Sequence, residues 1–441
     1  MSDSSPDSLI IIGGGLAGSE AAWQAASRGI AVRLYEMRPN KLTEAHHTGL
    51  MGELVCSNSL RSNDPQSAPG LLKRELSMGG SLIMEAAEAA TVPAGSALAV
   101  DRMVFAEFIS QRLEAHPNIT VIREEMTELP GQLAVLATGP LTSEAMSKSL
   151  SDIVGSDYLY FYDAIAPIVD AASIDDAKVY RMSRYGKGGD DYVNCPMTKE
   201  EYERFYAALT TADSLTPRNF EENRVFEGCM PIEMMAVRGV DTPRFGPMKP
   251  VGLRDPRTGR DSYAVVQLRA ENRELTAYNL VGFQTRLKWP EQKKVFSLIP
   301  GLEKAEFLRY GSLHRNTFIN APLSLNRDLS LKARKDLFVA GQITGVEGYI
   351  ESTAMGLIAG INAASRIRGQ QPVPVPSVSA HGALIGHLVE TENKHFQPSN
   401  INFGLFPVPA AAAQIRDKKA RRAIIVEQAL KDWEQYLEHV L

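Results

Sequence analysis

The sequence predicts an α/β fold in which both ends of the chain contribute to one Rossmann-like domain. Residues 9–29 give the first indication, with an apolar run, three consecutive glycines and a stretch of small helix-forming residues. Residues 337–364 repeat this order of strand, glycine and helix near the other end of the chain. Near residue 160 the pattern changes to short strands and polar loops. We therefore expect an α+β domain inserted between two halves of the Rossmann-like domain.

The expected organisation has four segments. Residues 1–160 hold the first half of the Rossmann-like domain, and residues 301–370 hold the second half. Residues 161–300 hold the inserted domain, which we expect to bind substrate. Residues 371–441 begin with a stiff proline-rich linker and continue as a C-terminal helical segment.

The first segment begins with a complete βαβ unit. The continuous apolar run at residues 9–12 is typical of a parallel strand that is buried on both faces. The helix that follows ends at Gly29, and residues 30–36 predict the second strand. Residues 101–116 predict another helix, with its apolar side chains on one face.

Other parts of the chain give local predictions of the same kind. Residues 119–123 and 133–137 predict strands, and residues 199–209 predict an amphipathic helix. Residues 414–441 predict a charged helix. By contrast, residues 40–100 are rich in Gly, Ser, Asn and Pro, so we expect a long irregular loop there, and such loops are often functional.

Composition excludes several classes of protein. The chain has 441 residues, of which 44% are hydrophobic and 22% charged, and its net charge of −5 gives no general attraction to polyanions. Cys56, Cys195 and Cys229 are too few for a disulfide framework and lack zinc-site spacing, so we expect a cytoplasmic protein without a bound metal. No run approaches the ~18 apolar residues of a membrane-spanning helix, so we expect no membrane association.

The first glycine motif predicts a dinucleotide site. It comprises Gly13, Gly14, Gly15 and Gly18, which allow a tight turn, close approach of a pyrophosphate and close packing of helix on strand. The pyrophosphate would lie at the helix N-terminus, where free N–H groups favour negative charge. Glu36 ends the second strand and suits a ribose hydroxyl.

The late motif indicates which dinucleotide is bound. A glutamate-bearing Rossmann unit combined with a late strand, Gly341 and helix resembles the two-dinucleotide flavoproteins, which implies FAD. In that superfamily the late helix N-terminus faces the flavin, and most members have Asp after the glycine. This chain has Gln342 there, so the usual carboxylate contact to the ribityl chain cannot be transferred. Gly348 and Tyr349 follow at the expected edge of the flavin.

Longer motifs make the resemblance more specific. Residues 341–362 resemble the GidA-like flavoproteins that modify tRNA uridines. Residues 53–61 and 226–233, supported by 194–202 and 313–320, resemble the folate- and FAD-dependent tRNA (uracil-5-)-methyltransferases. That family implies methylation of the T-loop uridine of tRNA (position 54 in the tRNA convention). It also implies 5,10-methylenetetrahydrofolate as the carbon donor and reduced FAD, recharged by NADH or NADPH, as the hydride source.

Two cysteines are the candidate catalytic residues. Carbon C5 of uracil becomes nucleophilic when a thiolate adds to C6, and a folate methylene needs a hydride to become a methyl group, which a flavin can supply. Cys56 lies in a polar loop near Arg61, and a neighbouring cation favours the thiolate. Cys229 lies in a second motif, whereas Cys195 reads as a structural residue. The sequence leaves open which cysteine attacks C6.

The remaining candidates concern the flavin edge and the folate. Tyr349 is predicted to stack on the flavin or the pterin, although a buried core tyrosine is an equally simple interpretation. His314 is a candidate to stack on the pterin, and Arg315 to pair with the glutamate tail of folate. Glu347 and Glu351 are candidates to accept from pterin N–H groups.

RNA binding has only diffuse support in the sequence. Basic residues gather in three short runs, which are also explained as solvated surface: Arg254, Arg257 and Arg260; Lys288, Lys293 and Lys294; and Arg416, Lys418, Lys419, Arg421 and Arg422. Four alternatives to tRNA methylation also remain. The first two are the same chemistry on ribosomal RNA and a carboxymethylaminomethyl-type tRNA-modifying flavoprotein, which the late motif also resembles. The other two are a flavin-dependent NAD(P)H oxidoreductase without an RNA substrate, such as a disulfide reductase, and a non-catalytic RNA-binding flavoprotein.

Overall fold

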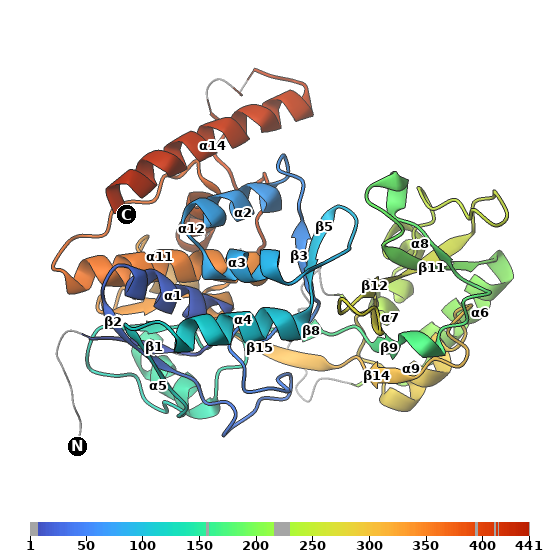
Figure 1. Cartoon of the computed structure of the whole chain (residues 1–441), viewed down its shortest axis with the longest axis horizontal. Coiled ribbons are helices and arrows are strands. Elements are labelled where there is room, and N and C mark those ends of the chain that lie inside the picture. The colour runs from blue at the N-terminus through green and yellow to red at the C-terminus, as the bar shows by residue number, and fades with distance from the viewer. Residues whose placement is uncertain are drawn as a thin grey trace.

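The computed structural model describes residues 8–155, 158–215, 230–392, 396–409, 412 and 414–440, with the backbone alone at residues 158–163 and 313–315. These residues form two lobes that lie side by side (Figure 1). The larger lobe contains the N-terminal and C-terminal parts of the chain, and the smaller lobe contains the middle. This arrangement confirms the predicted α/β fold with an inserted α+β domain and a helical C-terminal segment.

A five-stranded parallel sheet forms the centre of the larger lobe. Its strand order is β16-β7-β1-β2-β6. The strands are β1 Ser8–Ile12, β2 Ala31–Tyr35, β6 Ile119–Ile122, β7 Ala134–Leu136 and β16 Leu337–Val339. Every residue of β1 and β7 is buried, as expected for the middle of a parallel sheet. Because β16 pairs with β7, the early and late parts of the chain share one sheet.

Helices α1 (Leu16–Ser27) and α11 (Tyr349–Ile367) lie against each other beside this sheet (Figure 1). A Cβ atom on Gly356 would lie 2.3 Å from the carbonyl oxygen of Ala17, which only glycine allows. The small residues of both helices therefore permit an unusually close approach, and this approach brings the two glycine motifs together.

Residues 40–100 contain more regular structure than predicted. They include helices α2 (Ala68–Met78) and α3 (Leu82–Ala89) and an antiparallel sheet of β3 (Ser59–Ser62), β5 (Ala97–Val100) and β4 (Thr91–Val92). The prediction of a long loop was wrong here because Ser67 and Ser81 act as helix N-caps. Their hydroxyl groups accept hydrogen bonds from the N–H groups of Gly70 and Met84. Between β2 and β3, however, the chain has no helix or strand.

The strands predicted at residues 119–123 and 133–137 are confirmed as β6 and β7, and the helix predicted at residues 101–116 is also confirmed. Helix α4 (Arg102–Glu114) is capped by Asp101, whose carboxylate accepts from the N–H groups of Met103 and Val104. Helix α5 (Glu144–Val154) follows β7, and the short α10 (Ala321–Ser324) precedes β16.

The smaller lobe is built on a six-stranded antiparallel sheet of order β10-β11-β12-β13-β9-β14. Its strands are β9 Ile168–Asp170, β10 Tyr180–Arg181, β11 Tyr192–Met197, β12 Ala264–Ala270, β13 Ala277–Leu280 and β14 Phe307–Arg309. Its helices are α6 Lys199–Thr211, α7 Ile232–Val237, α8 Thr242–Phe245 and α9 Trp289–Phe296. This lobe has its own core, which extends along the chain from Val169 to Ala305.

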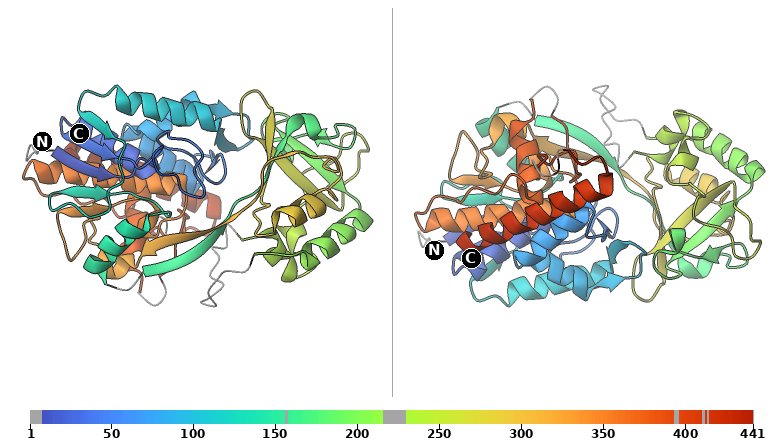
Figure 2. Two further views of the ribbon diagram at one scale, coloured as in Figure 1. Left: turned by 90° about the horizontal axis from the view of Figure 1, so that it is seen from below. Right: turned by 90° about the horizontal axis from the view of Figure 1, so that it is seen from above.

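Two long strands connect the lobes. Strand β8 (Tyr158–Ala164) enters the smaller lobe and β15 (Leu313–Ile319) leaves it, and the two pair in antiparallel register (Figure 2). Short 3₁₀ turns lie at Ala171–Ser173, Arg184–Gly186 and Gln342–Thr344.

The C-terminal segment is anchored on α2. Helices α12 (Ala380–Glu390) and α14 (Lys418–Val440) pack on the larger lobe. The carboxylate of Glu75 accepts from the N–H of Ala380 at 2.8 Å and lies 2.8 Å from Nδ1 of His381. The indole of Trp433 donates to the carbonyl of Glu75 and stacks on the His381 ring at 4.2 Å. Four fully buried contacts thus connect α2, α12 and α14.

A buried carboxyl group in α1 predicts a pH dependence of stability. Glu20 is fully buried, and its oxygens accept from Gln24, from the Ser81 hydroxyl and from the N–H of Ile83. Burial raises its pKa from 4.5 to about 7. The folded protein therefore binds a proton that the unfolded chain has already lost, so this group stabilises the fold at low pH and the benefit is lost as pH rises through 7.

We expect the free energy of unfolding to fall by about 3 kcal/mol between pH 4 and pH 8 because of Glu20, at about 1.36 kcal/mol per pKa unit. Glu20→Gln, which cannot ionise, should flatten this part of the profile. Urea denaturation of both proteins across the pH range measures the difference. Parallel profiles would contradict the prediction.

Candidate functional site

A pocket opens at the carboxyl ends of the parallel strands, and we call it the sheet-edge pocket. Its lining includes residues that follow β1, β2, β7 and β16, among them Gly13, Glu36, Gly139 and Gly341. In open parallel sheets, ligands bind at this edge where the strand order reverses. Here the reversal lies between β1 and β7.

The glycines of the first motif shape this pocket. Gly13 has a φ of +102°, and a Cβ there would lie 2.5 Å from the carbonyl oxygen of Ala137. A Cβ on Gly18 would lie 1.8 Å from the carbonyl oxygen of Gly13, so α1 packs directly on the turn. At Gly15, however, a Cβ would meet no atom within 4 Å. The space beside the N-terminus of α1 is therefore open, and it is suitable for an anionic group.

Glu36 is placed at the same edge as an ionised acceptor. It accepts from the N–H of Gly14 at 2.7 Å and from Nε of Arg38 at 2.9 Å. Burial raises the pKa of Glu36, but the hydrogen bonds and charge of Arg38 outweigh this and hold it below its ordinary value. Glu36 also accepts from the backbone N–H and a second guanidinium nitrogen of Arg38, at 3.0 and 3.1 Å. A carboxylate has about four lone-pair positions, so a ribose hydroxyl would share or replace one of the Arg38 donors.

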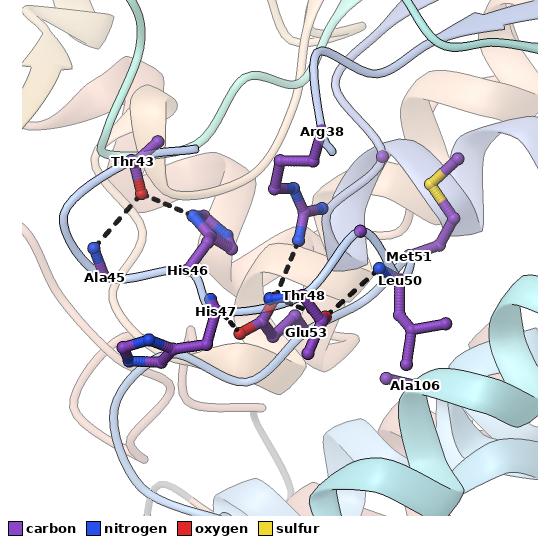
Figure 3. A network of polar contacts seen from close by, with 12 residues as sticks. Arg38, Thr43, Ala45, His46, His47, Thr48, Leu50, Met51, Glu53 and Ala106 are labelled. Carbon is purple, nitrogen blue, oxygen red and sulfur yellow. Dashed lines mark hydrogen bonds and ion pairs between the residues drawn. The ribbon is translucent and has the colours of Figure 1, made fainter. Parts of the chain in front are cut away.

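Arg38 also holds the loop that borders the pocket, as Figure 3 shows. Its guanidinium donates to Glu53 at 3.1 Å. Glu53 accepts in turn from the N–H of His47 at 2.8 Å and from the hydroxyl of Thr48 at 2.7 Å. Burial, together with the charge of Arg38, lowers the pKa of His46 to about 4, so this ring is neutral at pH 7. No motif in the sequence indicates this network, because its residues are joined by contacts that depend on the folded loop.

The late motif forms the opposite side of the pocket. Gly341 has a φ of +84°, and the side chain of Gln342 donates to Glu347 at 2.7 Å. Gly348 has a φ of +116°, and a Cβ there would lie 2.3 Å from Oε2 of Glu351. Tyr349 is the first residue of α11. The two glycine motifs, distant in the sequence, therefore line one pocket.

A second cavity, of about 340 Å³, lies between the lobes, and we call it the interdomain cavity. Residues of both lobes line it, including Cys56, Arg61 and Glu347 from the larger lobe and Arg269 and Gln284 from the smaller. The two cavities adjoin, because the same residues line both: Val55, Pro140, Leu141, Gln342 and Tyr349.

Cys56 lies where these cavities adjoin. It is half-buried and lines the interdomain cavity. Its backbone N–H donates to the hydroxyl of Tyr349 at 2.8 Å. This bond fixes the position of the cysteine relative to the N-terminus of α11.

Guanidinium groups from both lobes hold the Cys56 loop. Arg102, at the start of α4, donates to the carbonyl oxygens of Leu54 and Cys56, each at 2.5 Å. Arg309, in β14, donates to the carbonyl of Val55 at 2.8 Å. Further along the loop, Arg269 of β12 donates to the side chains of Ser57 and Asn58. None of these three arginines was predicted from the sequence to lie at the site.

Arg61 has a different partner from the one expected. It was expected to act as the cation beside Cys56, but it pairs with the buried Glu351 at 2.7 Å. Burial raises the pKa of Glu351 above its ordinary value, although the charge of Arg61 acts in the opposite direction. Arg61 has a φ of +65° and lines the interdomain cavity.

The other predicted residues have mixed outcomes. Cys195 is fully buried in β11, and burial raises its pKa, which agrees with a structural role. Cys229 lies outside the described residues. His314 and Arg315 belong to β15, where their backbones pair with Asp163 and Tyr162 of β8, but their side chains are outside the description.

Some residues of the three basic runs already contact other groups of the protein. Arg257 pairs with Asp255 at 2.8 Å and donates to the carbonyl of Ala177, so it stabilises its own lobe. Arg254 donates to the carbonyl of Gly259. In the C-terminal run, Arg422 lies over the ring of Phe403 at 5.3 Å.

Metal-binding clusters and membrane-spanning helices are both absent from the described part of the chain. Within it, no group of three or more His, Cys, Asp and Glu side chains is arranged to hold a metal ion. None of its helices has both the length and the apolar character needed to cross a membrane.

Comparison with known proteins places this architecture in a family. The family model described as glucose inhibited division protein A (GidA) matches residues 8–371. The structure of Aquifex aeolicus GidA superposes with a TM-score of 0.68 at 18% sequence identity, over 98% of this chain and 74% of that one. At this identity the superposition establishes the fold alone.

Curated relatives are much more similar in sequence. Methylenetetrahydrofolate–tRNA-(uracil-5-)-methyltransferase TrmFO of Moorella thermoacetica is 57% identical over 428 residues, which are 97% of this chain and 98% of that protein. The TrmFO protein of Geobacter sulfurreducens is 57% identical over 434 residues, which are 98% of this chain and 99% of that protein. The chain therefore belongs to the TrmFO family, within the wider GidA group.

Proposed function

We propose that this protein transfers a one-carbon unit from 5,10-methylenetetrahydrofolate to C5 of the T-loop uridine of tRNA. The product is 5-methyluridine, with FAD as the hydride source and NADH or NADPH as the reductant. The observation that carries the proposal is the position of Cys56, which lines the interdomain cavity and donates its N–H to Tyr349, a residue shared with the sheet-edge pocket. The activity named for the curated relatives supports the same reaction.

The residues of the sheet-edge pocket fit FAD. Gly13, Gly14, Gly15 and Gly18 would hold its pyrophosphate, since the space beside Gly15 is open at a helix N-terminus. Glu36 would accept from the ribose, and Gly341 and Gln342 would contact the flavin end. When bound, the flavin supplies the hydride that converts a folate methylene into a methyl group.

The cysteines would activate the uracil. One thiolate adds to C6, which makes C5 nucleophilic toward the one-carbon unit, and it leaves again after a base removes the C5 proton. We propose that Cys229 is the thiolate that adds to C6. We propose that Cys56, which lies beside the sheet-edge pocket, acts in the steps at C5. Near Cys229 in sequence, the N–H of Ile232 donates to the carbonyl of Gln284, a residue that lines the interdomain cavity.

Folate would occupy the interdomain cavity next to Tyr349. We propose that Tyr349 stacks on a planar ring there and that Glu347 accepts from pterin N–H groups. Glu347 lines the cavity and is oriented by the hydrogen bond from Gln342. His314 and Arg315 remain proposed contacts for the pterin and the glutamate tail.

A flavin-dependent disulfide reductase fits the site less well. Such an enzyme needs two cysteines close enough to form a disulfide. Of the two described cysteines, Cys56 lies in the larger lobe and Cys195 is buried in the sheet of the smaller lobe. The proposed chemistry uses separate thiols instead.

One assay tests the proposed function. The protein is incubated with methylenetetrahydrofolate, NADPH and either unmodified tRNA or ribosomal RNA, and 5-methyluridine is mapped in both. We expect product at the T-loop uridine of tRNA and none in ribosomal RNA. Product in ribosomal RNA alone would show that the substrate is ribosomal RNA and not tRNA. Thiol–disulfide turnover without any methylated RNA would overturn the proposal.

The cysteine variants test the catalytic roles. Cys56→Ala and Cys229→Ala should each lower methylation at least about 1,000-fold, because covalent addition and proton removal are both needed for turnover. Cys56→Ala keeps the backbone N–H that donates to Tyr349, so bound flavin should remain. Cys195→Ala is the matched control and should retain activity. Turnover close to wild type in either of the first two variants would contradict the assignment.

Gly15 provides a test of the flavin site that is separate from catalysis. A side chain at Gly15 would meet no protein atom within 4 Å but would fill the space proposed for the pyrophosphate. Gly15→Val should therefore lower the flavin content of the purified protein at least about tenfold, while the free energy of unfolding of the flavin-free protein changes by about 1 kcal/mol, as at other N-cap positions.

Gly131 offers the matched control, since a Cβ there also meets no atom within 4 Å and the residue lies outside both cavities. Gly131→Val should keep its flavin. Flavin absorbance per protein and urea denaturation measure the two quantities. Equal flavin content in both variants would argue against the proposed pyrophosphate position.

A further inference from the structure

A ladder of aromatic rings leads from the core of the smaller lobe to its surface. Phe296 is fully buried, and its ring centre lies 6.4 Å from that of Phe307. Phe307 stacks on Tyr310 at 5.2 Å, with ring planes 12° apart. Tyr310 stacks on Trp289 at 5.6 Å, with ring planes 15° apart. The last three rings are thus nearly parallel.

The outer end of this ladder is open to solvent. Trp289 is 61% exposed although Tyr310 covers one face of its ring. The other two tryptophans differ, since Trp433 is fully buried and Trp23 is half-buried. Single exposed aromatic side chains are common on protein surfaces. Trp289 differs in that its ring is held in a parallel stack with Tyr310 and Phe307.

Charged residues lie around the open end, and lysines outnumber carboxylates among them. Trp289 begins α9, whose residues include Lys293 and Lys294, and Lys288 directly precedes it. Lys288 pairs with Asp213 at 3.2 Å, and Lys294 lies 3.6 Å from Glu291. For Lys293, no ion pair with another described residue is found. The three lysines and the two carboxylates together leave one net positive charge beside the ladder, which suits a phosphate backbone.

The ladder is joined firmly to the wall of the interdomain cavity. Gln292 donates to the carbonyls of Leu287 and Gly311, at 2.7 and 2.9 Å, and so connects α9 with the segment that follows β14. A Cβ on Gly311 would lie 2.6 Å from the carbonyl oxygen of Ile165, which lines the cavity.

The arginine before Tyr310 continues this connection. Arg309 donates to the carbonyl of Val55, a residue that lines both cavities. The stacked rings thus lie at a fixed position relative to the Cys56 loop, on the part of the smaller lobe that contains β14 (Figure 1).

We propose that Trp289 is a stacking platform for an unpaired base of the RNA substrate, with Lys293 and Lys294 contacting the adjacent phosphates. A nucleobase is planar, and it would extend the ladder by one parallel ring. Base–aromatic stacking is tolerant of sequence but needs a base whose face is free, as in a loop or at an opened pair. The inference rests on the proposed function and adds to it a surface outside the cavities that receives the RNA.

Intrinsic fluorescence and binding of unmodified tRNA transcript test the platform. The flavin-loaded, full-length protein is used throughout. Trp289→Ala should weaken tRNA binding about 5- to 100-fold, which corresponds to the loss of one stacked base. Trp289→Phe keeps a ring and should bind within about twofold of wild type, but the tRNA-dependent quenching of tryptophan emission should disappear.

Salt dependence separates stacking from charge. Trp289→Ala removes no charge, so the slope of log affinity against log salt concentration should stay as in wild type, whereas the Lys293→Ala, Lys294→Ala double variant should reduce the slope. Phe245, which is 82% exposed in α8 of the same lobe, supplies the matched control. Phe245→Ala should leave tRNA binding unchanged.

The outcomes distinguish this inference from the proposed function. If wild type binds and methylates tRNA but Trp289→Ala binds within twofold of it, the platform is wrong and the function stands. If sedimentation shows a wild-type dimer that Trp289→Ala dissociates, the ladder is an interface between copies of the chain, and the platform is again wrong. If wild type neither binds nor methylates tRNA, the proposed function itself fails.

Discussion

The hydrogen bonds to the carbonyl oxygens of residues 54–56 are the interaction on which the arrangement of the two lobes depends. Arg102 of the larger lobe holds two of these carbonyls, and Arg309 of the smaller lobe holds the third. A guanidinium has only donors and a carbonyl oxygen only accepts, so the two kinds of group are complementary. Moving one lobe away would break the bond from Arg309 to Val55 and the ion pair between Arg102 and Glu271 of the smaller lobe, while Arg102 would keep its two carbonyl acceptors. The interdomain cavity therefore keeps its shape because the loop that carries Cys56 is bonded to both of its walls.

The electrostatics of this loop follow from the same contacts. Burial by itself lowers the pKa of Arg102, but the ion pair with Glu271 raises it above its ordinary value, so the group stays charged. Burial also lowers the pKa of Arg309. On the other side of the loop, the Tyr349 hydroxyl receives the N–H of Cys56. The thiol, the sheet-edge pocket and the interdomain cavity are thus positioned by one short segment, as the proposed reaction between a hydride donor and a nucleophile would require.

The parts of the fold that sequence could predict are those set by local pattern. The strand, glycine turn and helix from Ser8 to Ser27 are visible in apolar runs and glycine spacing, and so is Glu36 after β2. Helix α2 was missed because glycine, serine and proline around it suggested a loop, although Ser67 caps it. The contacts of Arg102 and Arg309 were beyond prediction for a different reason. They join residues far apart in the chain, and a backbone carbonyl acceptor leaves no mark in the sequence. Proximity in sequence was also misleading for Arg61, which was expected to be the cation beside Cys56. Its backbone has a positive φ, and its side chain pairs with the buried Glu351 instead.

A protein with a net charge of −5 must bind RNA through local features, if tRNA is its substrate. The lysines of α9 are partly neutralised by Asp213 and Glu291, so charge alone offers a modest contribution there. Stacking supplies affinity that does not depend on net charge, and it also restricts orientation because two planar rings must lie parallel. Since Gln292 and Gly311 connect the aromatic ladder to the cavity wall, a base stacked on Trp289 would have a defined position relative to Cys56. Orientation of the RNA would then arise from the rigidity of the smaller lobe, and charge would serve mainly to attract the substrate.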